Sequence, residues 1–170
     1  MSAPVGAGGG IFRAIHHIGV SVLEIERSVG FWERLLGRPA RWRRLLDGAY
    51  LGEVTGYPGI RLEAAVVDLP GGAALELLQY LVDGRRPHDP ATAHPGNVHV
   101  CLLVDDLDAA WRHALEAGAT PVSPRPVDIT AGPNAAARSC YLRDPDGVTI
   151  ELFQAPPTAG ADPAAGLAPS

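Results

Sequence analysis

The sequence has few of the features that mark secreted, membrane-spanning or nucleic-acid-binding proteins. Its 170 residues include only two cysteines, Cys101 and Cys140, which are too few for a disulfide framework or a zinc site of paired cysteines. No apolar run approaches the ~20 residues needed to cross a bilayer. The glycine-rich start lacks the basic and apolar regions of a signal peptide. We therefore predict a cytoplasmic protein without a membrane partner.

Positive charge is also sparse. The formal net charge is −5 at pH 7, and the 14 basic residues, all of them arginines, form no long run. Because a basic patch is what binds a phosphate backbone, we expect no nucleic-acid partner. Hydrophobic residues make up 46% of the chain, which is enough to bury a sizeable core in a globular protein of this length.

Apolar periodicity predicts a first module over residues 13–82. It contains a helix over 25–36 that ends at Gly37, and a turn-rich loop over 47–59 with one short helical turn. Alternating patterns predict strands over 15–22, 40–46, 60–69 and 73–81. The sequence Pro70-Gly71-Gly72 predicts a hairpin between the last two of these strands.

The same order of elements is predicted for a second module over residues 97–155, after a proline-bearing linker over 83–96. A helix over 107–117 ends at Gly118, and Asp144-Pro145-Asp146-Gly147 predicts a turn between the last two strands. The strands are expected at 98–104, at 120–127 as an edge strand interrupted by prolines, at 135–142 and at 148–153. The ends, 1–12 and 156–170, are predicted to be disordered tails.

Each predicted module carries one histidine on its first strand and one glutamate on its last. These are His17 and Glu76 in the first module and His99 and Glu151 in the second, at nearly equal spacing. Two nitrogen and two oxygen donors, with positions left open for substrate, suit one divalent ion such as Ni, Co, Mn, Fe or Zn. We predict a metal site formed by these four side chains. The alternative for each residue alone is a hydrogen-bonded or solvent-facing side chain.

Two neighbouring residues are candidates of lesser weight. His16 is the rival of His17, but strand alternation places it on the opposite face, where we expect a structural role. Cys101 is expected on the same inner face as His99. It has no visible activating group, so a small packed thiol is the preferred interpretation.

Several motifs together resemble the vicinal oxygen chelate superfamily, which includes glyoxalase I, methylmalonyl-CoA epimerase, extradiol dioxygenases and bleomycin-resistance proteins. The resemblance spans residues 13–155 and implies an α+β fold, in which two tandem βαβββ modules form an open, cup-shaped eight-stranded mixed sheet around one metal. It also implies a homodimer. The motifs are His17-Ile18-Gly19-Val20-Ser21-Val22, Phe31-Trp32, Leu35-Leu36-Gly37, Leu75-Glu76-Leu77-Leu78-Gln79-Tyr80, His99 with Val104-Asp105-Asp106-Leu107-Asp108, and Asp144-Pro145-Asp146-Gly147 leading to Glu151.

The resemblance also implies an activity. His17, Glu76, His99 and Glu151 match the four-ligand set of glyoxalase I and methylmalonyl-CoA epimerase. We therefore expect an isomerase or epimerase that moves a proton at a carbon α to the carbonyl of a small-molecule substrate, through a metal-bound enediolate or enolate. An acyl-CoA, a keto-cyclitol and a keto-sugar are candidate substrates. The alternatives are a lactoylglutathione lyase of the glyoxalase I type, an iron-dependent extradiol-type dioxygenase and a non-catalytic protein that binds an antibiotic or natural product.

Similarity to the relatives suggests which groups act on the proton. Glu76 and Glu151 are the leading bases, as inferred for glyoxalase I relatives. Glu53 or Glu63 would be a dedicated base by similarity to the epimerases, with a surface salt bridge as the alternative role. Tyr141 is a candidate for orienting the substrate.

Overall fold

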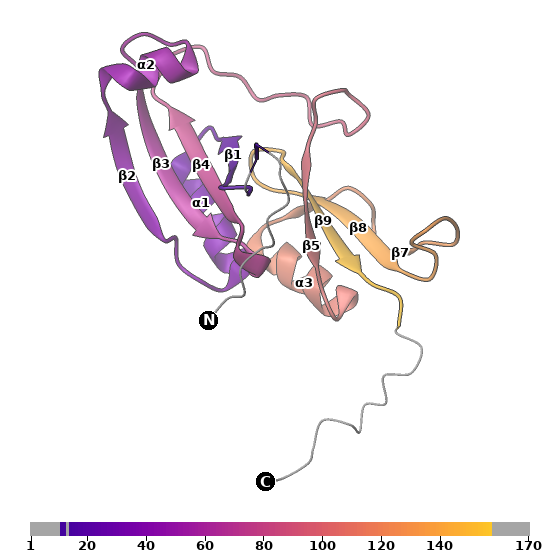
Figure 1. The fold of residues 1–170 in the computed structure, drawn as a ribbon. Coiled ribbons are helices and arrows are strands. Elements are labelled where there is room, and N and C mark those ends of the chain that lie inside the picture. Colours follow the sequence, from indigo (N-terminus) through magenta and orange to yellow (C-terminus); the bar gives the residue numbers. More distant parts are fainter. Residues whose placement is uncertain (1–10, 13, 158–170) are drawn as a thin grey trace.

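The computed structural model describes residues 11–12 and 14–157 (Figure 1). Most of the two predicted tails, 1–12 and 156–170, therefore lies outside the described residues. Among the residues that are described, no helix is long and apolar enough to cross a membrane.

The first module forms a four-stranded sheet in the order β1-β4-β3-β2. Strand β1 runs parallel to β4, and the other neighbours are antiparallel. A 3₁₀ turn at Pro70–Gly72 joins β3 to β4 where the sequence predicts a hairpin. The elements are β1 (Ile18–Ser21), α1 (Ile25–Leu36), β2 (Trp42–Asp47), α2 (Ala49–Thr55), β3 (Arg61–Asp68) and β4 (Ala74–Tyr80).

The second module repeats this plan in a sheet of the order β5-β9-β8-β6, in which β7 also pairs with β8. Strand β5 runs parallel to β9, as β1 does to β4. The elements are β5 (His99–Leu103), α3 (Leu107–Ala117), β6 (Thr120–Pro121), β7 (Val127–Asp128), β8 (Arg138–Arg143) and β9 (Thr149–Gln154). The predicted α+β fold of two βαβββ modules is confirmed.

Two details of the prediction were wrong. The strands form two sheets, of four and five strands, rather than one eight-stranded sheet. The expected edge strand over 120–127 is split into β6 and β7, because proline nitrogens cannot donate to a strand ladder. The short helical turn predicted within 47–59 is present as the seven-residue helix α2, whose Leu51 packs with Ile60 and Leu62. Figure 1 shows α2 beside the end of β2 and the start of β3.

One continuous apolar core joins the two modules. Helix α1 contributes the fully buried Phe31 and Trp32, and α3 contributes Leu107 and Trp111. The two helices also pack against each other. Both sheets turn alternate residues towards this core, among them Leu75 and Leu77 of β4 and Ile150 and Leu152 of β9. The opposite face of each sheet, which we call the inner face, carries Glu76 in the first module and Glu151 in the second, and in the first sheet it also carries the apolar Leu62 and Leu78.

The start of each helix is fixed by the strand that carries the predicted ligand. Gln79 Oε1 accepts a hydrogen bond of 2.7 Å from the backbone N–H of Ile25, and Gln154 Oε1 accepts one of 3.0 Å from that of Leu107. The first N–H groups of a helix have no partner within the helix, so these glutamines satisfy donors that would otherwise be unpaired. Each glutamine follows its module's glutamate by the same interval, and the cap is therefore part of the repeat.

Candidate metal centre between two modules

Strand register places Glu76 on the inner face of the first sheet. Its β1 partner is Gly19, and its β4 neighbours Leu75 and Leu77 point to the core on the other side. The glutamate lies 3.2 Å from His17, measured from Oε2 to Nε2. His17 precedes β1 rather than lying within it, because the strand begins at Ile18.

The second module builds an equivalent pair. His99 Nε2 lies 3.1 Å from Glu151 Oε2, and Cys101 is the β5 partner of Glu151. The side chains of His17 and His99 are 39% and 41% exposed, and those of Glu76 and Glu151 are 19% and 17% exposed. This agreement shows that the sequence repeat is also a repeat of environment.

Two further residues support Glu151. Ser139 on β8 donates a 2.7 Å hydrogen bond from Oγ to Glu151 Oε1, so that Oε2 is the oxygen directed to His99. Tyr141 is the β8 partner of Glu151, and its ring centroid lies 5.4 Å from that of His99. The structure thus brings the predicted Tyr141 to the second pair. Ser139 was missed, although strand alternation from Tyr141 places it on the same face.

Burial and the Glu151 carboxylate favour the protonated, uncharged forms of Cys101 and Tyr141. Burial, and then the Glu151 carboxylate, raises the pKa of the Cys101 thiol to about 11. Burial, Glu151 and Cys101 also raise the pKa of Tyr141. Cys101 is therefore a protonated thiol at neutral pH, but it is exposed and not the packed thiol that was predicted.

His16 does not occupy the opposite face as predicted. Its Nδ1 lies 2.7 Å from His17 Nδ1, and the two rings meet edge to face with centroids 5.0 Å apart. The alternation argument failed because the extended strand starts one residue after His17, so strand geometry does not govern this pair.

The structure pairs the four predicted ligands two by two. Within residues 11–12 and 14–157, no group of three or more His, Cys, Asp or Glu side chains lies close enough together to hold a metal ion. The donor types fit a divalent ion, and each pair offers one imidazole nitrogen and one carboxylate oxygen on an inner face. One ion bound by all four side chains stays a prediction.

The other two candidate bases lie apart from these pairs. Glu63 is on the helix-covered face of the first sheet, where it accepts a 2.8 Å hydrogen bond from Arg43 Nη2. Glu26 and then Glu63 raise the pKa of Arg43, as expected for a guanidinium between two carboxylates. Glu53 is exposed on α2. Glu63 therefore has the salt bridge that was its alternative role.

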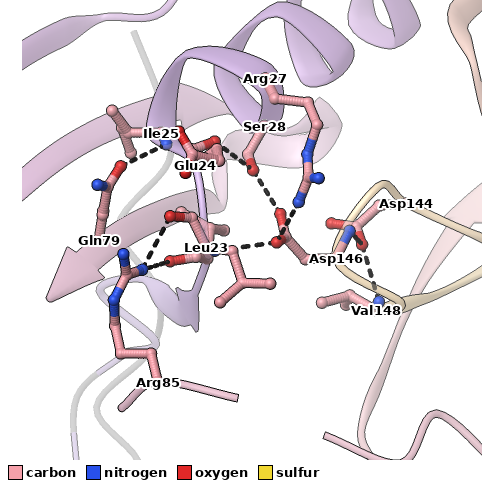
Figure 2. A network of polar contacts seen from close by, with 11 residues as sticks. Leu23, Glu24, Ile25, Arg27, Ser28, Gln79, Arg85, Asp144, Asp146 and Val148 are labelled. Carbon is pink, nitrogen blue, oxygen red and sulfur yellow. Dashed lines mark hydrogen bonds and ion pairs between the residues drawn. The ribbon is translucent and has the colours of Figure 1, made fainter. Parts of the chain in front are cut away.

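The predicted turn before β9 has a second role that sequence reasoning missed. Figure 2 shows Asp146 of this turn against the start of α1. Its Oδ1 accepts hydrogen bonds from the Leu23 backbone N–H at 2.9 Å and from Arg27 Nη2 at 2.6 Å, and its Oδ2 accepts one from Ser28 Oγ at 2.5 Å. Asp144 shapes the turn itself by accepting from the N–H groups of Asp146 and Val148. The hydrogen bonds of Asp146 therefore connect the second module to the first.

A cavity of about 610 Å³ lies beside these contacts, with Asp146 in its lining. Its lining includes Gly19 and Ser21 of β1, Tyr80 at the end of β4, and Arg85, Arg86 and Asn97 of the linker. Since Gly19 is the strand partner of Glu76, the cavity borders the first His–Glu pair.

Paired βαβββ modules with matching inner-face residues define a class of fold, and sequence comparison identifies the family. The model of the Glyoxalase/Bleomycin resistance protein/Dioxygenase superfamily matches residues 14–152. The chain belongs to this superfamily, which confirms the resemblance predicted from its motifs.

Individual relatives agree with this assignment. The chain is 27% identical over 146 residues to a 2-epi-5-epi-valiolone epimerase from an Actinomyces species, covering 84% of this chain and 80% of the relative. It is 31% identical over 143 residues to an uncharacterized protein of Bacillus subtilis, covering 84% and 98%. A glyoxalase family protein from Bacillus cereus has the same fold, with a TM-score of 0.70 at 23% identity over 89% of this chain and 99% of that one.

Proposed function

We propose that this protein is a divalent-metal-dependent epimerase or isomerase that moves a proton at a carbon next to a carbonyl group. The observation that carries the proposal is the pair of His–Glu contacts at 3.2 and 3.1 Å, one on each inner face. Each pair has an equivalent place in its module, as expected for two halves of one site.

A cyclic polyhydroxylated ketone is the substrate class that we favour over an acyl-CoA thioester. A relative that matches most of this chain is named as an epimerase of such a compound. Hydroxyl-bearing side chains also line the inner faces, with Ser21 and Tyr80 in the first module and Ser139 and Tyr141 in the second. Such groups suit the hydroxyls of a cyclitol.

His17 and His99 would hold the ion together with the two glutamates. When bound, a divalent metal supplies a Lewis acid that makes a proton beside a carbonyl easier to remove. Glu151 is held on both oxygens, by Ser139 and His99, and is suited to remain in place. Glu76 has its described contact with His17 alone, so we assign Glu76 as the group that accepts and returns the proton.

Two measurements test this proposal. Elemental analysis of protein purified without added metal should find about one divalent ion per site. Deuterium from heavy water should then wash into the α-position of 2-epi-5-epi-valiolone or a related keto-cyclitol. Absence of metal, together with absence of exchange after reconstitution with Ni, Co, Mn, Fe or Zn, would refute the proposal.

The same preparation separates the alternatives. Turnover of the hemithioacetal of methylglyoxal and glutathione would indicate a lactoylglutathione lyase, and oxygen uptake with catechols would indicate a dioxygenase. Tight binding of a natural product without turnover would indicate a binding protein. The homodimer predicted from the family resemblance belongs to this proposal too, and light scattering of the purified chain tests it.

A further inference from the structure

The cavity beside the first His–Glu pair has room for more than the reacting part of a substrate. Its volume of about 610 Å³ lies within the range of about 300–1,000 Å³ that is usual for drug-sized ligands. At Gly19, no heavy atom lies within 4 Å of the place that a Cβ would take. Open space therefore reaches the strand position opposite Glu76.

A fixed guanidinium forms part of the cavity wall. Arg85 Nη1 donates to the carbonyl oxygens of Val22 at 3.2 Å and Leu23 at 2.8 Å; Figure 2 shows Arg85 beside Leu23. Arg85 Nε also donates to the carbonyl oxygen of Val82 at 3.3 Å. These bonds hold the half-buried Arg85 against the end of β1. A cation held in this way keeps its position when a ligand arrives.

The net charge of the cavity lining is positive. Arg86 follows Arg85 along the chain and is exposed at the cavity. The acidic residue of the lining is Asp146, which is 4% exposed and already paired with Arg27. The carboxylate is thus neutralised within the protein, while Arg86 lines a space that a ligand can enter.

Uncharged groups in the lining add directional and stacking contacts. The imidazole of His88 lines the same space and can donate a hydrogen bond, whereas the Asn97 amide nitrogen already donates to the carbonyl oxygens of Asp89 and Ala91. Tyr57 and Tyr80 form an aromatic wall with ring centroids 5.7 Å apart. The cavity therefore offers cations and donors to one part of a ligand and aromatic faces to another.

We propose that this cavity binds an anionic oxygen group, a phosphate or a carboxylate, on a part of the substrate remote from the reacting carbon. The inference rests on the proposed function and narrows its substrate class from neutral keto-cyclitols such as 2-epi-5-epi-valiolone to related keto compounds that carry such a substituent. Arg86 is the principal charged contact, and Arg85 is the fixed one. A guanidinium matches both kinds of anion, because its N–H groups form paired hydrogen bonds to two oxygens.

The test uses inorganic phosphate and acetate as separate probes at constant ionic strength. Amide resonances of the protein are followed by NMR during each titration, with the protein as purified and again after its metal has been removed. The variant Arg86→Gln removes the proposed contact at an exposed position, where folding is not at risk. Arg125→Gln is the matched control, since it removes the same charge from an exposed residue that does not line the cavity.

We expect saturable shifts of the amides of Arg86, His88 and Asn97, about tenfold weaker binding in Arg86→Gln and unchanged binding in Arg125→Gln. The probe with the higher affinity identifies the preferred group. The inference is overturned if neither probe saturates, if both variants weaken binding equally, or if removal of the metal abolishes binding. Failure of the proposed function is a separate result, because a protein without metal or proton exchange would still bind the anion.

Discussion

Asp146 and Leu23 are joined by a hydrogen bond of 2.9 Å although they belong to different modules. The carboxylate of Asp146 also binds Arg27 and Ser28, and its side chain is 4% exposed. This one residue therefore satisfies three donors at the start of α1. It connects the strand that carries Glu151 to the strand that follows His17.

We predict that Asp146→Asn destabilises the protein by about 1–3 kcal/mol, because the amide loses the charge that Arg27 and Ser28 contact. The free energy of unfolding in urea measures the effect. Asp128→Asn is the control, since the Asp128 side chain is 79% exposed, and its ion pair with Arg138 should contribute less than about 1 kcal/mol. An equal decrease in the free energy of unfolding of the two variants would show that the Asp146 contact between modules contributes no more than an exposed ion pair.

The variants Glu76→Gln and Glu151→Gln should lose different properties, deuterium exchange in the first and metal content in the second. Glu151→Gln is expected to lower metal content, because the residue is held in place as a ligand by Ser139. Glu76→Gln is expected to slow deuterium exchange by about 100-fold or more while it retains more of the metal, since it removes the proposed base. Metal analysis and exchange on the same samples separate the two roles. The reverse pattern would reassign the base to Glu151.

Ser139→Ala should weaken metal binding by about 10- to 100-fold without unfolding the protein. The hydroxyl orients Glu151 from outside the predicted ligand set, and loss of such support typically has an effect of this size. Competition with a metal chelator gives the affinity. Ser123→Ala is the control, because Ser123 bonds the carbonyl of Arg125 in a different segment and should leave the affinity unchanged.

Cys101 should react slowly with iodoacetamide despite its exposure. Its pKa is raised from 9.0 to about 11, so the thiolate fraction at pH 8 is about 100-fold lower than that of an unperturbed thiol. In a Cys140→Ala background, the alkylation rate should rise with pH up to about 11. Glu151→Gln should lower this pKa, because the carboxylate contributes to the shift. A rate equal to that of the unfolded chain would contradict the described environment.

The sequence predicted the features that depend on local periodicity. The helix over 25–36 and its end at Gly37 follow from apolar spacing and from the left-handed conformation of the glycine, which has φ 64°. The two-residue period of a strand placed Glu76 and Glu151 on the face opposite the core. These features require only the pattern of neighbouring residues.

Features that depend on distant contacts were not predictable in this way. Asp146 was interpreted as part of a turn, but its partners Leu23 and Ser28 lie more than a hundred residues away. Helix α2 contains glycine and ends at another, and its stability comes from packing of Leu51 on the sheet rather than from helix propensity. The glutamine caps are visible in the sequence only once the repeat has been aligned with the helix starts.

Helix α2 makes the two halves of the repeat unequal. It lies between β2 and β3, and no helix stands at the corresponding place between β6 and β8 among the described residues. A site made of two identical halves would present the same surroundings to either side of a bound ring. With α2 packed on the first sheet alone, the surroundings differ from side to side, and a ring has one orientation that fits best. The loss of symmetry between the two modules thus provides a physical basis for binding a ring in one of the two orientations that a symmetric site would offer equally.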